Sequence, residues 1–268
     1  MTEPQLLKAW RALDTRTPPF LLGGDEALLE GGRSVVLRSR DELLAHPSFD
    51  FLADPTLHLG LLPIPFAGNL SEADVFILLQ NPGFRPSDYF SQFDDPDLVE
   101  ALTANLRQGI PQGGFPFLFL DPRFSYHGGF DYWRRKLKGL LSLAMDQHQM
   151  TLPEALHLFS RRVAILELLP YHSSVGGLGK RLLGELRSVS LMRSFVQEHL
   201  LPRAESGDAL LIVTRQAQHW GIEPTNNVIV YKGAEARSAH LSPRSRGGRA
   251  IAERLSLDKA LANGPSPP

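Results

Sequence analysis

Val75–Phe84, VFILLQNPGF, is the stretch that decides the fold. Its first five residues are apolar without a break, and the turn sequence QNPG follows at residues 80–83. An uninterrupted apolar run that ends in turn residues is typical of a strand buried on both faces of a parallel sheet. Ligands of such sheets bind at the carboxyl ends of the strands, which predicts a site at this turn. On its own, an N-P-G turn is more often an ordinary strand exit.

The rest of the chain alternates apolar runs with helical patterns, and strands that alternate with helices predict a mainly parallel sheet covered on both faces. We therefore expect an α/β fold, a three-layer α/β/α sandwich around a central, mainly parallel four-stranded sheet. We expect residues 1–60 to form an N-terminal extension packed on the core, residues 61–262 the α/β domain, and residues 263–268, NGPSPP, a disordered tail. Strands are expected at 57–65, 75–79, 163–170, 209–213 and 227–231, and helices at 4–13, 130–148, 180–187, 191–203 and 251–262.

Composition excludes several classes of function. The chain has 268 residues, a formal net charge of -1 and no cysteine. A nearly neutral chain does not attract nucleic acid as a whole, so any such surface must be local. The missing cysteines exclude disulfides, thiolate metal sites and a cysteine nucleophile, and the histidines lack a ligand spacing, so neither metal nor cofactor is expected. The N-terminus, MTEPQLLKAW, lacks the features of a signal peptide, and no apolar run is long enough to span a membrane; both predict a cytoplasmic protein.

Three other segments carry polar or aromatic residues of interest. Glu167 interrupts the apolar run 163–170, VAILELLP, where a carboxylate is costly unless it is paired, protonated or part of a site. Residues 88–100 contain five acidic residues and no basic one, a pattern that favours a solvated face. The aromatic residues 115–119 and the segment YHSS at 171–174 are candidates to wall a pocket, although aromatic clusters more often belong to a core.

The ordered motifs resemble those of the uracil-DNA glycosylase superfamily. In that family a strand leads into Gly-x-Asn-Pro-Gly or Gly-Gln-Asp-Pro-Tyr, and a later His-Pro-Ser-Pro is followed by a wedge residue. Here the strand ends in QNPG, and HLSPRS stands at residues 240–245. Between them, AQHWG at 217–221 matches the family's phosphate-binding turn, Ala-Gln-x-x-Gly. Leu79 and Leu241 depart from the pattern, because they replace the Gly of the first motif and the Pro of the second.

The resemblance implies an enzyme that flips a nucleotide out of double-stranded DNA and hydrolyses its N-glycosidic bond. It implies that Asn81 positions the attacking water and that His240 donates a hydrogen bond to the base as negative charge develops, although a lone His is more often structural. Arg244 stands at the wedge position. Residues 232–254 contain six basic and two acidic residues, a local cationic surface. The residues expected to contact phosphates are Arg215, Ser242, Arg246 and Arg249.

Two positions bear on which base is removed. By the resemblance, uracil-specific members carry a Tyr at the position of Gly83 that shuts out 5-substituted pyrimidines, and Glu167 aligns with the Asn that reads uracil. A protonated Glu can donate to N3 of cytosine, accept from its amino group and pass on its proton, whereas a carboxylate repels O4 of uracil. The alternative is that Glu167 pairs with an Arg or with His172. The residues expected around the base are Gln80, Gly83, Phe84 and Glu167.

We therefore predict a monofunctional DNA glycosylase for a 5-substituted cytosine, such as hydroxymethylcytosine or its glucoside in phage DNA. The resemblance extends to an anti-phage branch of the superfamily that removes such bases and leaves abasic sites. Two alternatives stay open: a repair glycosylase for uracil or 5-hydroxymethyluracil, and a non-catalytic module that binds modified DNA. The expected partner in each case is double-stranded DNA, without a membrane.

Overall fold

The computed structural model describes residues 3–29, 34–46, 56–110, 112–174 and 180–257. Its centre is a five-stranded sheet with the strand order β3-β5-β4-β6-β7. Neighbouring strands run parallel except at β3, which pairs antiparallel with β5. The strands are β3 (Phe66–Ala67), β4 (Val75–Leu79), β5 (Val163–Glu167), β6 (Leu210–Val213) and β7 (Val228–Val230). The prediction of a mostly parallel α/β sheet is confirmed.

The central strand β4 divides the core into two halves. Val75, Ile77 and Leu79 pack into one hydrophobic cluster, whereas Phe76 and Leu78 pack into a second cluster on the opposite face of the sheet. Successive side chains of a strand point to opposite faces, so an element covered on both sides must be apolar at every position. This explains the unbroken apolar run, in which all five side chains are buried.

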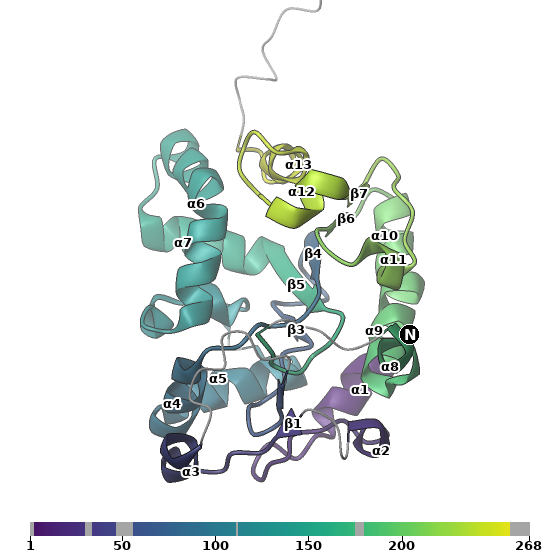
Figure 1. Ribbon diagram of the computed structural model, residues 1–268. Coiled ribbons are helices and arrows are strands. Elements are labelled where there is room, and N and C mark those ends of the chain that lie inside the picture. Colours follow the sequence, from purple (N-terminus) through teal and green to yellow (C-terminus); the bar gives the residue numbers. More distant parts are fainter. Residues whose placement is uncertain (1–2, 30–33, 47–55, 111, 175–179, 258–268) are drawn as a thin grey trace, which may run out of the picture.

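Helices cover both faces of the sheet, with α6 and α7 on one side and α9, α10 and α11 on the other (Figure 1). Before β4 the chain forms α1 (Gln5–Arg11), α2 (Glu26–Leu29) and α3 (Arg40–Ala45), with the two-stranded parallel pair β1 (Ser34–Val35) and β2 (Leu57–His58). Between β4 and β5 lie α4 (Pro86–Asp94), α5 (Pro96–Arg107), η1 (Leu118–Leu120), η2 (Pro122–Phe124), α6 (Gly128–His148) and α7 (Leu152–Arg162). After β5 follow α8 (Lys180–Glu185), α9 (Arg187–Phe195), η3 (Val196–Leu200), α10 (Leu201–Glu205), α11 (Ala217–Trp220), α12 (Gly233–Ser238) and α13 (Arg246–Arg254).

The prediction of a core strand over residues 57–65 is wrong. Leu57 and His58 pair with β1 instead, and the edge of the main sheet is the later strand β3. Pro63 and Pro65 lack the N–H that a continuous ladder requires, so the segment between them cannot extend the sheet. The carbonyl of Pro65 still accepts the N–H of Glu167 at 2.8 Å, which aligns β3 beside β5. The sheet therefore has five strands rather than the expected four.

The described part of the N-terminal region packs on the main sheet's helices. Leu6 and Trp10 of α1 are each 1% exposed and join the core cluster that also contains Val189 and Met192 of α9. Near the other end, α13 begins at Arg246, earlier than the helix expected at 251–262, because Ser245 caps it by accepting the N–H of Gly248. The tail expected at 263–268 lies outside the described residues.

Candidate active site

A pocket of about 340 Å³ lies at the carboxyl ends of β4 and β5, within the size range of small-molecule sites. The two strands are paired in register, so Leu79 lies opposite Glu167 and the residues after both strands meet. The wall includes the turn 80–84, the start of α4, the first two turns of α6 with the preceding His127, the loop after β5, Phe119 of η1 and Arg215 after β6. The sequence placed a ligand at this edge, and the pocket is found there.

Asn81 is held in one orientation. Its Nδ2 donates to the carbonyl of Ser173 at 2.7 Å. A carbonyl only accepts hydrogen bonds, so this contact identifies the nitrogen and leaves Oδ1 as the acceptor on the other side of the amide. A backbone hydrogen bond also holds the turn, because the carbonyl of Gln80 accepts the N–H of Leu169 at 2.8 Å. The arrangement presents a fixed hydrogen-bond acceptor at the pocket.

Glu167 lines the same pocket and is 4% exposed. Its Oε2 is buried, and among the described residues it has no hydrogen-bond partner. Burial raises the pKa of this carboxyl well above its ordinary value of 4.5, against the opposing influence of the positive charge of Arg215. His172 is not its partner, because the two ring nitrogens of His172 face the carbonyls of Gly83 and Leu62, each at 3.1 Å. The protein therefore holds an acid that favours its neutral form.

The buried acid predicts a pH-dependent stability difference between the wild type and Glu167→Gln. The folded chain holds this proton more tightly than the unfolded chain does, so the stabilising contribution is complete below about pH 4.5 and is lost as the pH rises towards the folded pKa. The free energy of unfolding of the variant relative to the wild type should then increase by up to about 1.4 kcal/mol per pH unit. Urea unfolding at several pH values measures it. A difference that stays constant with pH would contradict the buried, proton-holding state.

Arg85, Asp88 and His127 form a polar part of the pocket that the sequence interpretation missed. Asp88 was expected on a solvated acidic face, yet its side chain is only 13% exposed, and burial raises its pKa to about 6. Its Oδ2 accepts the N–H of Arg85 at 2.8 Å. The signal was present: Pro86 directly follows the turn and starts a helix, which places the third helical residue, Asp88, beside the turn.

His127 caps the N-terminus of the long helix α6. Its Nδ1 accepts the N–H of Gly129 at 3.0 Å, so in the neutral ring the proton is on Nε2. Nε2 lies 3.7 Å from Oδ1 of Asp88. Burial, and then the nearby charge of Arg85, lower the pKa of His127 to about 4, which favours the neutral ring.

Aromatic rings form the apolar walls. Tyr132 and Trp133 line the pocket from α6 and pack edge to face with ring centroids 5.2 Å apart, and Phe119 faces the pocket from η1. Phe84 also lines the pocket, but one face of its ring stacks on His58, with centroids 3.5 Å apart. Of the expected aromatic loop, only Phe119 belongs to this pocket.

Most residues of the expected DNA-contacting segment lie outside the pocket. His240 is exposed on the loop between α12 and α13 and is not among the pocket-lining residues. Along the chain, helix α12 separates β7 from this loop. The neighbouring Leu241 is buried in the core, with 1% of its surface exposed. Asn81 and His240 therefore do not line one pocket. Ser242, Arg244 and Arg249 are exposed.

Arg246, which was expected to contact a phosphate, is engaged within the protein. It pairs with Glu235 at 2.7 Å and donates to the carbonyl of Val230 at 2.8 Å. These contacts join α13 to α12 and to β7. Pro243 contacts α6 at Gly139, where an added Cβ would lie 2.7 Å from its ring. Gly139 is about 10 Å along the helix from the pocket residue Tyr132, at ~1.5 Å per residue.

A second hollow of about 550 Å³ adjoins the pocket and shares Gln80 and Arg215 with it. It is open and is also lined by Lys232 and Arg237, so three basic side chains border it. The described residues show no acidic side chain along its walls. The sequence analysis predicted that Arg215 contacts a phosphate. It did not name Lys232 or Arg237 for this role.

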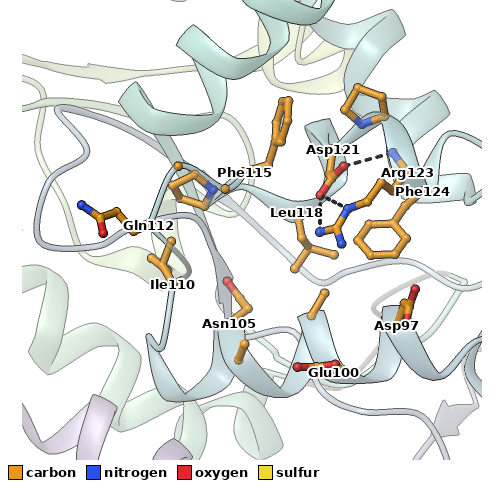
Figure 2. Close-up of a pocket in the computed structure, with 16 residues that line it drawn as sticks. Asp97, Glu100, Asn105, Ile110, Gln112, Phe115, Leu118, Asp121, Arg123 and Phe124 are labelled. Atoms are coloured by element: carbon orange, nitrogen blue, oxygen red, sulfur yellow. Dashed lines mark hydrogen bonds and ion pairs between the residues drawn. The ribbon is translucent and has the colours of Figure 1, made fainter.

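A separate hollow, of about 690 Å³, lies between α5 and the segment 112–124 (Figure 2). Its arginine is already engaged, because Arg123 donates to Asp121 at 2.7 Å (Figure 2). Phe115 lies here rather than in the pocket beside Asn81. Apart from this expected aromatic segment, the residues predicted for the site do not line this hollow.

Within the described residues, no helix is long and apolar enough to cross a membrane, and no group of three or more His, Asp or Glu side chains is arranged to hold a metal ion. Comparison with models of protein families, with curated protein sequences and with solved structures gives no match.

Proposed function

We propose that the chain is a DNA glycosylase that excises a flipped 5-substituted cytosine, with the fold of the uracil-DNA glycosylase superfamily. One observation carries the proposal: a fixed amide acceptor, Asn81, and a buried acid, Glu167, line one pocket at the ends of neighbouring parallel strands, and Oε2 of Glu167 has no hydrogen-bond partner among the described residues. Water activation and stabilisation of a leaving base are the two requirements for hydrolysing an N-glycosidic bond, and these groups supply one each.

The neutral acid favours cytosine over uracil as the base. A protonated Glu167 donates one hydrogen bond and accepts another, which matches the N3 acceptor and the amino donor of cytosine. Transfer of its proton to N3 as the glycosidic bond breaks would leave the departing base neutral. The flat rings of Tyr132 and Phe119 supply apolar walls for a planar base.

The adjoining hollow supports DNA as the partner. Arg215, Lys232 and Arg237 border this hollow. Gln80 lines both the hollow and the pocket. Basic side chains beside a pocket neutralise phosphates and hold the strand while one nucleotide is flipped. His240 does not line the pocket, so its catalytic role stays a prediction of the resemblance.

The test is base release from duplexes that carry uracil, cytosine, 5-hydroxymethylcytosine or its glucoside, with alkali cleaving the abasic sites. We expect release from the substituted cytosines and none from uracil, because a neutral acid at Glu167 matches the cytosine edge. Release from uracil alone would make the chain a repair glycosylase and remove Glu167 as the base reader. Binding of modified duplexes with no release of any base would favour a non-catalytic module.

Release from substituted cytosine would also support a role in defence against phages, because some phages replace cytosine in this way. An infection experiment then separates defence from repair. The protein should reduce the yield of a phage with modified cytosine and leave the yield of a phage with ordinary cytosine unchanged.

A further inference from the structure

The pocket has two chemically distinct ends. At one end the charge of Arg215 acts on Glu167 and on the hydroxyl of Tyr132. At the other end the charge of Arg85 acts on Asp88 and on His127. The proposed reading of a cytosine edge uses the first end only. The second end is polar and has no role in that chemistry; the side chains of Asp88 and His127 are largely buried there, and Arg85 is exposed.

Gly83 leaves room for a ligand beside the second end. It has a φ of 61°, and a Cβ added there would meet nothing within 4 Å. Its carbonyl faces Nδ1 of His172 at 3.1 Å, which fixes the turn. Arg85 follows two residues later, and its Nη1 would lie 3.7 Å from a Cβ added at Gly128. Gly83, Arg85 and Asp88 thus line one pocket, and the space beside Gly83 is open.

The donors and acceptors at this end identify a chemical class. Asp88 supplies an acceptor, Oδ1, whereas His127 supplies the Nε2 donor and Arg85 its guanidinium donors. A hydroxyl group both donates and accepts, so hydroxyls suit a carboxylate that stands beside N–H donors. A phosphate or carboxylate on the ligand would be repelled by Asp88, and an ammonium group by Arg85.

We propose that Arg85, Asp88 and His127 form a second recognition end of the pocket, which binds the hydroxyl groups of a neutral, sugar-like substituent at C5 of the base. This inference rests on the proposed function, because it assigns the part of the substrate that the glycosylase chemistry does not need. It predicts that the enzyme prefers a glucosylated hydroxymethylcytosine over 5-methylcytosine, which has no hydroxyl.

Two variants remove the recognition and keep the helix caps. In Asp88→Asn the amide oxygen can still accept the N–H of Arg85, but an NH₂ group replaces the free acceptor. In His127→Asn a favourable N-cap residue remains, but the Nε2 donor is lost. The matched control is Glu154→Gln, because Glu154 accepts the N–H of Thr151 at the same helical position of α7 and is exposed, away from the pocket.

The measurement is kcat/KM for base release from duplexes with glucosylated hydroxymethylcytosine and with 5-methylcytosine. Asp88→Asn should lower the ratio of the two values roughly ten- to a hundredfold, as expected for the loss of a hydrogen bond to a charged group. His127→Asn should lower it roughly two- to tenfold, as expected for a neutral hydrogen bond, and the control should keep the wild-type ratio. An equal fall on both substrates would show that these residues only support the fold and would overturn the proposal.

A binding measurement separates this proposal from the proposed function. If the wild type releases no base from any duplex, the glycosylase proposal fails, and fluorescence anisotropy with the same duplexes then decides the second end alone. Tighter binding of the glucosylated duplex that Asp88→Asn abolishes would retain it as a binding end. Equal affinity of the wild type for the two duplexes would overturn it.

Discussion

Replacing Asn81 by Ala is expected to lower base release from a 5-substituted cytosine duplex by roughly a hundred- to a thousandfold, the usual cost of one preorganised polar group at a reacting centre. The contact with Ser173 holds the amide so that Oδ1 is the free acceptor, and the variant loses the group that would orient the attacking water. DNA affinity should change little, because Asn81 is not among the basic side chains that would hold the phosphates.

Single-turnover base release and anisotropy measure the two quantities. The matched control is Asn227→Ala, because Nδ2 of Asn227 also donates to a backbone carbonyl, that of Ala204 at 3.0 Å, but lies outside the pocket. The control should cost some stability and leave the rate of release within a fewfold of the wild type. Release by Asn81→Ala at nearly the wild-type rate would reject Asn81 as the group that positions water.

Replacing Glu167 by Gln is expected to lower the rate of release from substituted cytosine about a hundredfold or more, the range of general acid catalysis. The amide can still donate to N3 and accept from the amino group, so the affinity for the duplex should be kept while proton transfer is lost. An amide can also turn over and match the N3 donor and the O4 acceptor of uracil. The variant should therefore gain release from uracil relative to the wild type.

The pH dependence separates the two roles of Glu167. The protonated acid is the active form and its pKa is raised, so wild-type release should be complete at low pH and fall as the pH rises through that pKa. Arg215 and Tyr132 are the other ionisable groups whose charges interact with it. The Gln variant lacks this fall. A wild-type rate that increases over the same pH range, or equal rates for the two proteins, would exclude Glu167 as the acid.

Features that depend on neighbouring residues were predictable from the sequence. The apolar run Val75–Leu79 became the central strand, because a strand covered on both faces needs an apolar residue at every position. The helix expected at 130–148 is α6, which begins at Gly128. The local pattern Thr-x-x-Glu at residues 151–154 forms a capping box at the start of α7, with 2.7 Å between the Thr151 nitrogen and the Glu154 carboxylate.

The edge of the sheet and the position of His240 were not predictable in this way. The prolines at 63 and 65 interrupted an apolar run that otherwise matched a strand, and the edge strand moved to Phe66–Ala67. The motif HLSPRS lies on a loop whose position is set by α12 and by the buried Leu241, contacts that no local pattern shows. A motif that resembles a family's motif predicts the order of residues along the chain. It does not predict the distance between these residues in the folded protein.

The sequence by itself determined the central parallel strands and the edge at which Asn81 and Glu167 meet, because the carboxyl ends of parallel strands lie together whatever surrounds them. Only the tertiary structure decided the protonation state of these residues and which side chains surround them. Among the described residues Oε2 of Glu167 has no hydrogen-bond partner, and Asp88 is buried beside His127; both features arise from segments far apart in the chain. Desolvation and charge interactions depend on distances through space, and those distances exist only once the chain has folded.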